Sequence, residues 1–227
     1  MRAKVVIALF GALCVSASLS ALTVDELDAN FGLIYIGTTD PGASGPSIIT
    51  PLYGVSLPMQ LSGPFFIEPM LELYTTYYQW TGTAAAPASM ESPTGFLTLG
   101  ALLSMHGGAR WAVSPVLTVG GSLGLDFLLR FPIEFLMPDQ NPAADTGSGF
   151  GWFFGAARFI YPEARAFLRW QVTDAIGLVF NLRAWFPLFK LWDGQNLPFP
   201  DQFMFAGGIG FAVKLHRPSP TADAASK

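Results

Sequence analysis

The chain has 227 residues, of which 51% are hydrophobic and only 12% are charged, and its formal net charge is −4. A soluble domain carries about 25% charged residues and a disordered chain is poor in apolar ones, so this composition is typical of a membrane protein. Its 24 glycines and 18 prolines nevertheless argue against a bundle of membrane-spanning helices and against a coiled coil.

Residues 1–21 have the pattern of a secretory signal peptide. Arg2 and Lys4 form a short positive region, residues 5–15 are apolar, and residues 16–21 are small and suit cleavage. The alternative is a transmembrane anchor, but the apolar segment is short for a span of about 20 residues. We therefore expect an exported protein.

The only cysteine, Cys14, lies within the predicted signal peptide, and Leu13 before it does not suit a lipoprotein signal. We expect a mature protein without cysteine, and hence without disulfides, thiol catalysis or a thiolate metal site. Loss of Arg2 and Lys4 leaves 10 basic residues against 16 acidic ones, a net charge of −6. This is the wrong sign for a nucleic-acid binder.

Two polar segments belong to the ends of the mature chain. Residues 22–29, which include Glu26 and Asp28, are predicted to form a short solvated lead-in to a membrane domain that ends at residue 217. Residues 218–227 are small, polar and contain proline, so we predict a disordered C-terminal tail.

Period-two alternation recurs through the mature chain, as in strands with one lipid face and one lumen face. It is clearest in residues 116–130, where one parity is apolar and the other carries small and polar residues. Longer uncharged stretches contain proline or glycine and do not suit a helix. The eight predicted strands cover residues 27–38, 47–61, 65–80, 96–113, 116–130, 150–172, 175–189 and 203–216.

The connections between these strands alternate in length. The short ones are residues 61–64, 114–115 and 173–174, and the long ones are about 39–46, 81–95, 131–149 and 190–202. This pattern is typical of a bacterial outer-membrane barrel with both termini on the tight-turn, periplasmic side. We therefore predict an all-β fold, an eight-stranded antiparallel transmembrane β-barrel with an up-and-down meander. The alternative, a soluble secreted β-sandwich, would need polar outer faces.

The layout resembles the small eight-stranded outer-membrane barrels, in particular the OmpW and OmpA-like groups. The resemblance covers about 27–216, and Gly208, Gly210, Phe211, Val213 and Leu215 resemble a terminal assembly signal. The chain departs from the family pattern because it continues past Leu215. The OmpW resemblance implies passage of small hydrophobic molecules through a narrow lumen, and partners that include outer-membrane lipid and the assembly machinery.

Charged residues share the lumen parity of several strands. An eight-stranded barrel has an interior just wide enough for side chains to fill it, so we expect these charges to pair in a polar network that plugs the lumen. The residues assigned to this lumen network are Glu68, Glu72, His106, Arg110, Asp126, Arg130, Arg169 and Arg183.

The tryptophans lie near the predicted strand ends, where aromatic residues form belts at the two membrane–water interfaces. The residues assigned to these belts are Trp80, Trp111, Trp152, Trp170, Trp185 and Trp192.

Three functions remain open from the sequence. The first is a porin-like, narrow channel for small hydrophobic molecules, and the second is a surface-exposed structural or adhesive barrel with a plugged lumen. The third, an outer-membrane lipid-modifying enzyme, has little support, because His106 and Ser104 share a face without an obvious carboxylate to orient the histidine. We therefore predict no catalytic residues, no metal site and no cofactor.

Overall fold

A computed structural model describes residues 23–24, 26–40, 42–43, 47–133, 145–194, 198 and 200–215. The predicted signal peptide and C-terminal tail lie outside these residues. Among the described helices, none has the length and apolar character needed to cross a membrane.

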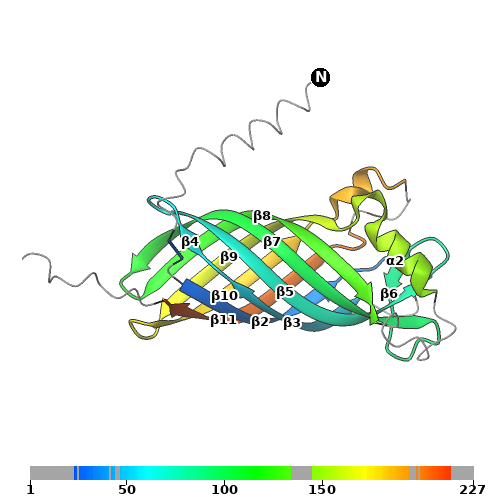
Figure 1. The fold of residues 1–227 in the computed structure, drawn as a ribbon, viewed down its shortest axis with the longest axis horizontal. Helices are drawn as coiled ribbons and strands as arrows, with labels where there is room; N and C mark the ends of the chain where they lie inside the picture. Colours follow the sequence, from blue (N-terminus) through cyan, green and yellow to red (C-terminus); the bar gives the residue numbers. More distant parts are fainter. Residues whose placement is uncertain are drawn as a thin grey trace, which may run out of the picture.

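Eight antiparallel strands form a closed barrel in meander order (Figure 1). Closure is made by β11 pairing with β2, while β5 pairs with both β3 and β7. This confirms the predicted fold class. The barrel strands are β2 (Glu26–Ile36), β3 (Ile48–Ser56), β5 (Phe65–Trp80), β7 (Gly95–Ser114), β8 (Leu117–Pro132), β9 (Ile160–Gln171), β10 (Ile176–Trp185) and β11 (Met204–Lys214).

Short elements gather at the two ends of the barrel. At the tight-turn end, β1 (Thr23–Val24) pairs with β4 (Met59–Gln60). At the loop end lie β6 (Ala85–Pro87), α2 (Thr146–Phe154), η3 (Gly155–Ala157) and η4 (Leu188–Leu191) (Figure 1). Glu26, the first residue of β2, lies opposite Lys214, the last residue of β11, in the strand register. Both ends of the barrel sequence therefore lie at the tight-turn end.

Three predicted strands were too long. The segment assigned to a strand at 47–61 is divided into β3, which ends at Ser56, and the short β4. The segment assigned to a strand at 150–172 begins with helix α2, whose N-terminus is capped by Asp145 accepting a hydrogen bond from the Ser148 amide at 2.9 Å. The segment assigned to a strand at 175–189 ends at Trp185, because Pro187 and η4 turn the chain away from the wall.

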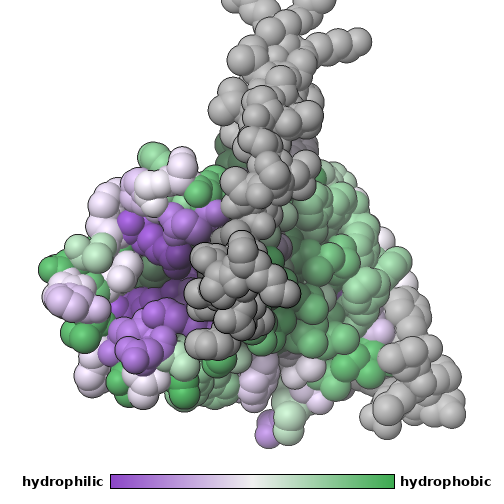
Figure 2. Space-filling model, turned by 60° about the vertical axis from the view of Figure 1, so that its left-hand side comes forward, coloured by the Kyte–Doolittle hydropathy of each residue, from purple (hydrophilic) through white to green (hydrophobic). Residues whose placement is uncertain are grey.

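The outer wall of the barrel is apolar along most strands. Leu123 is 72% exposed, Leu182 is 57% exposed and Phe211 is 56% exposed, whereas polar residues of the same strands face inward. Every barrel strand is about as long as, or longer than, the 9–11 residues that a transmembrane strand needs. Figure 2 shows this hydrophobic wall beside a hydrophilic opening at the tight-turn end.

Inward-facing glycines let large side chains lie over neighbouring strands. A Cβ at Gly124 would lie 1.9 Å from the ring of His106, its cross-strand neighbour. A Cβ at Gly100 would lie 2.2 Å from the ring of Tyr74. These two glycines therefore fix where the His106 and Tyr74 rings sit inside the barrel.

Candidate functional site: the ion-paired lumen

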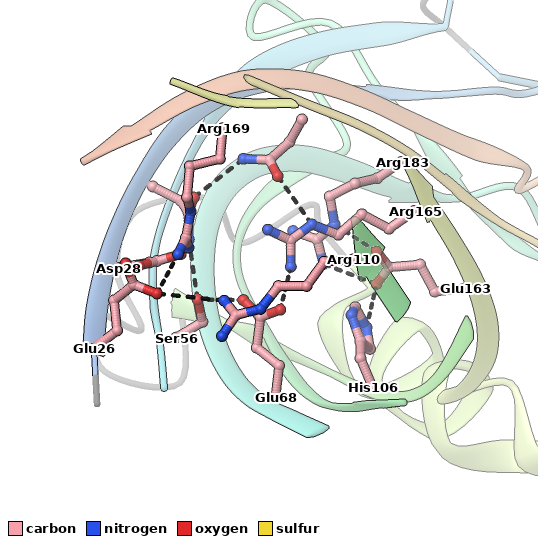
Figure 3. A network of polar contacts seen from close by, with 12 residues as sticks. Glu26, Asp28, Ser56, Glu68, His106, Arg110, Glu163, Arg165, Arg169 and Arg183 are labelled. Carbon is pink, nitrogen blue, oxygen red and sulfur yellow. Dashed lines mark hydrogen bonds and ion pairs between the residues drawn. The ribbon is translucent and has the colours of Figure 1, made fainter. Parts of the chain in front are cut away.

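The middle of the lumen is crossed by ion pairs between distant strands (Figure 3). Arg165 of β9 donates to Glu68 of β5 at 2.7 Å, and the Ser56 hydroxyl donates to the other Glu68 oxygen at 2.6 Å. Arg183 of β10 donates to Glu72 of β5. These strands lie three or four positions apart around the barrel, so each pair spans its interior.

A second carboxylate holds the other side of Arg183. The Nε and Nη2 atoms of Arg183 donate to the two carboxylate oxygens of Glu163 at 2.5 and 2.8 Å. This is the bidentate geometry of strong guanidinium–carboxylate pairs. Both side chains are nearly inaccessible to solvent. Removal of either residue would leave a buried charge without its partner.

His106 joins this network through its Nε2 atom. That atom lies 3.0 Å from Glu163 and 3.4 Å from Asp126, and the indole N–H of Trp185 donates to the other Asp126 oxygen. His106, Asp126 and Glu163 are the described residues grouped closely enough to offer ligands to a metal ion. Arg183 already engages both Glu163 oxygens, however, and its positive charge opposes a cation at this position.

The tight-turn end of the lumen holds a third set of pairs. Arg169 donates to Glu26 and, at 2.8 Å, to Asp28, whose exposed fraction is 0%. Arg110 donates to Gln60 at 2.6 and 2.9 Å and lies 3.6 Å from Glu26. The predicted solvated lead-in was therefore wrong for Glu26 and Asp28, because strand β2 begins at Glu26 and turns both carboxylates inward.

A cavity of about 870 Å³ opens below these pairs at the tight-turn end. Its lining includes Arg110, Arg169 and Lys214 together with Glu26 and Asp174. Figure 2 shows the hydrophilic residues around this opening. The hollow part of the lumen is thus a polar vestibule that ends where the crossing ion pairs begin.

The loop end of the lumen is covered by aromatic side chains. Trp152 and Phe153 of α2 pack with Tyr78 and Phe96 in one buried cluster, and Phe189 of η4 lies 6.4 Å from Trp152 between ring centroids. We call these five residues the aromatic lid. Trp152 and Phe153 are 6% and 0% exposed, so the lid is closed to solvent.

The structure places all eight predicted lumen residues on the inner face, but it does not join them in a single network. Arg130 is separate from the ion pairs and lies under the aromatic lid, with its guanidinium 4.3 Å from the Phe153 ring centroid. The other seven belong to the three sets of contacts above.

Two of the predicted belt tryptophans lie inside the protein. Trp185 is 0% exposed because it shares the inward parity of Asn181 and Arg183, and Trp152 is buried because α2 folds over the barrel end. Trp111 and Trp170 are 56% and 49% exposed on the outer wall near the tight turns. At the loop end, Trp80 is partly exposed and Trp192 is 55% exposed.

Four acidic and basic members of the network were not among the residues predicted from the sequence. Glu163 and Arg165 share a parity with Arg169, and this spacing was a usable signal once the strand had been separated from the helix before it. Glu26 and Asp28 alternate with Leu27 and Ala29, so the same two-residue period was present there, but their charges favoured the interpretation as a solvated segment.

Comparisons with known proteins identify the architecture. No protein-family model and no curated protein matches the sequence. Among solved structures, Neisserial surface protein A has a TM-score of 0.52 at 10% identity, with 86% of this chain and 99% of that one covered. The chain has the fold of the small eight-stranded outer-membrane barrels.

Two further barrels match with lower TM-scores. Ail of Yersinia pestis has a TM-score of 0.44 at 8% identity, and the match covers 85% of the present chain and 100% of the Ail chain. The N-terminal barrel of Pseudomonas aeruginosa OprF has a TM-score of 0.40 at 14% identity, and the match covers 84% of the present chain and 98% of the OprF barrel. At such identities the likeness describes the fold of the barrel and leaves its activity to be argued from the site.

Proposed function

We propose that the protein is an integral barrel of the bacterial outer membrane with a plugged lumen, acting as a structural or adhesive surface protein and not as a pore. The observation that carries this proposal is the set of ion pairs that join opposite walls, from Glu68 to Arg165 and from Glu72 through Arg183 to Glu163. The apolar outer wall supports outer-membrane lipid as its immediate partner.

The energetics of the crossing pairs favour a closed lumen. An eight-stranded barrel offers an interior that side chains can fill, and these pairs lie at its centre with almost no exposed surface. A passing solute would have to separate paired charges in a low-dielectric interior. Removing one partner of a buried pair costs about 3–5 kcal/mol, so each crossing pair opposes the passage of a solute.

The loop end supports a surface role. The indole N–H of Trp192 donates to the Ala156 carbonyl at 2.8 Å, which ties η4 to η3, and Leu191 beside it is 72% exposed. Lys190 and Asp201 form a buried ion pair at 3.0 Å beneath them. These contacts fix η3 and η4 in place at the loop end. The described part of this end can therefore contact a partner or the outer leaflet without a movement of the barrel.

The second candidate is the porin-like, narrow channel for small hydrophobic molecules. Apolar side chains do face the lumen, including Ile34, Leu52, Leu102 and Leu128, and they would suit such a solute. They pack with one another in a single buried cluster, however, so a hydrophobic solute would have to displace them.

Reconstitution distinguishes these candidates. We expect purified protein in planar bilayers to give no conductance steps and liposomes to take up no small hydrophobic probe, after heat-modifiable gel migration has shown that the protein is folded. A Glu68→Ser/Arg165→Ser variant, which removes one crossing pair without leaving an unpaired charge, tests how much of the block that pair supplies. Conductance steps or probe uptake by the folded, unaltered protein would contradict the plugged-lumen proposal.

Surface exposure has a separate test. We expect protease added to intact cells to cut the connection between β5 and β7, residues 81–94, and to leave residues 115–116 between β7 and β8 uncut. The opposite pattern would place the tight turns outside and contradict the proposed orientation with periplasmic termini.

A further inference from the structure

A buried arginine under the aromatic lid has no anionic partner among the described residues. Arg130 is 1% exposed, and its Nη2 atom donates to the Arg158 carbonyl at 2.9 Å. Its Nε atom is buried without a hydrogen-bond acceptor in the described part of the chain. A buried guanidinium normally lies against a carboxylate, because an unpaired charge in a low-dielectric interior is costly.

Three tyrosine hydroxyls surround the same charge. Tyr74, Tyr78 and Tyr161 are 2%, 0% and 0% exposed, and all three lie near Arg130. Within the described residues, none of the three hydroxyl oxygens makes a well-formed hydrogen bond. Buried hydroxyls are rarely left without a partner, so their convergence on an unpaired guanidinium requires an explanation.

The barrel wall is built to bring these groups together. Tyr74, Gly100 and Arg130 lie in one register row across β5, β7 and β8. Because Gly100 has no side chain, the Tyr74 ring lies over β7 and reaches toward Arg130. The Arg130 guanidinium also lies 5.9 Å from the Tyr78 ring centroid. The cluster is thus specified by strand register and does not depend on a loop.

The chemistry of the cluster is that of a donor set. Each tyrosine hydroxyl can donate one hydrogen bond and the guanidinium has five N–H groups. Among the described residues, the acceptor that one of these donors meets with good hydrogen-bond geometry is the Arg158 carbonyl. The aromatic rings of Phe153 and Trp152, at 4.3 and 5.7 Å from the guanidinium carbon, attract the cation through their faces. They offer no acceptor to the N–H and O–H groups.

We propose that Arg130 and the hydroxyls of Tyr74, Tyr78 and Tyr161 form a binding site for a small inorganic anion, of the size of chloride, enclosed beneath the aromatic lid. The anion accepts the unmatched hydrogen bonds and neutralises the buried guanidinium. Tyr74, Tyr78 and Tyr161 are all buried, at 2% exposure or less, so a monatomic ion suits this enclosed cluster better than a phosphate or an organic acid.

The test compares anions at constant ionic strength. The full-length protein is refolded and melted in sodium chloride or in sodium gluconate, whose anion is too large for the site. We expect a higher melting temperature in chloride, with a shift that grows as the logarithm of chloride concentration. A Tyr74→Phe/Tyr78→Phe/Tyr161→Phe variant keeps the rings and should melt at the same temperature in both salts.

A second measurement needs no variant. Crystals grown in sodium bromide should show an anomalous-scattering peak beside the Arg130 guanidinium. Equal melting in both salts together with no bromide peak would overturn the proposal. Glu134 and Asp139 belong to the sequence between β8 and α2. A Glu134→Gln or Asp139→Asn variant that acquires a chloride dependence absent from the unaltered protein would also overturn the proposal, because a carboxylate would then be the partner of Arg130.

Discussion

The contact between Gly124 and His106 gives the sharpest prediction about the lumen. An added Cβ at Gly124 would lie 1.9 Å from His106 Cδ2 and 2.5 Å from Nε2. The ring cannot easily move aside, because Nε2 is held 3.0 Å from Glu163 and 3.4 Å from Asp126. Gly124→Ala must therefore either strain the wall or expel the histidine from its carboxylates.

The size of the effect follows from whichever of these two outcomes costs less. Overpacking a well-packed interior costs about 1–3 kcal/mol, and loss of a hydrogen bond to a charged group costs about 1.5–3 kcal/mol. Because either route relieves the clash, we expect Gly124→Ala to lower the free energy of unfolding by about 1–3 kcal/mol, out of the 5–15 kcal/mol that is usual for a folded domain. Gly107→Ala is the matched control, since a Cβ there meets nothing within 4 Å.

The control should be neutral or slightly stabilising, by about 0.4–1 kcal/mol, because alanine reduces the freedom of the unfolded chain. Urea unfolding in detergent micelles, followed by tryptophan fluorescence, measures both variants, and gel migration of unheated samples confirms folding. If Gly124→Ala unfolds within about 0.5 kcal/mol of Gly107→Ala, the usual scatter of neutral substitutions, His106 is not held as described.

Three further predictions concern single side chains. Arg169→Ala should destabilise the barrel by about 3–5 kcal/mol. Arg110→Ala should destabilise it clearly less, because Arg110 is the more exposed of the two arginines. Equal melting temperatures of the two variants in detergent would contradict this order. Trp185→Phe should cost about 1–3 kcal/mol through the lost indole donor, whereas Trp170→Phe on the outer wall should change unfolding in urea little. Asp145→Ala should loosen α2 by about 0.5–2 kcal/mol, seen as faster proteolysis near residue 146, and unchanged cleavage would speak against the helix cap.

The barrel fold could be predicted from the sequence because a transmembrane β-sheet wall imposes a strict two-residue period of apolar and polar side chains. That period also sorted residues between lumen and lipid, as for Asp126 and Arg130. It even placed Trp185 inward, but the assignment of this residue to an aromatic belt relied on its nearness to a strand end and ignored its parity with Arg183. Local alternation was the better guide.

Other features were hidden because their causes are not local. Residues 150–154 are apolar on both parities, and periodicity alone does not distinguish a buried strand from a buried helix in so short a segment. The helix follows from the Asp145 cap, which is a weak signal by itself. The inward direction of Glu26 and Asp28 depends on Arg169, a partner on a strand far along the chain.

The long sequence separation of the crossing pairs has a consequence for how the barrel assembles. Glu68 and Arg165 are 97 residues apart, Glu72 and Arg183 are 111 apart, and Asp28 and Arg169 are 141 apart. Since β9 and β10 must be in place before these charges meet, the pairs form late, when the sheet closes. Interactions that form after the transition state slow unfolding and leave the folding rate almost unchanged. The ion pairs of the lumen thus slow the unfolding of the finished barrel, which makes it long-lived in the membrane.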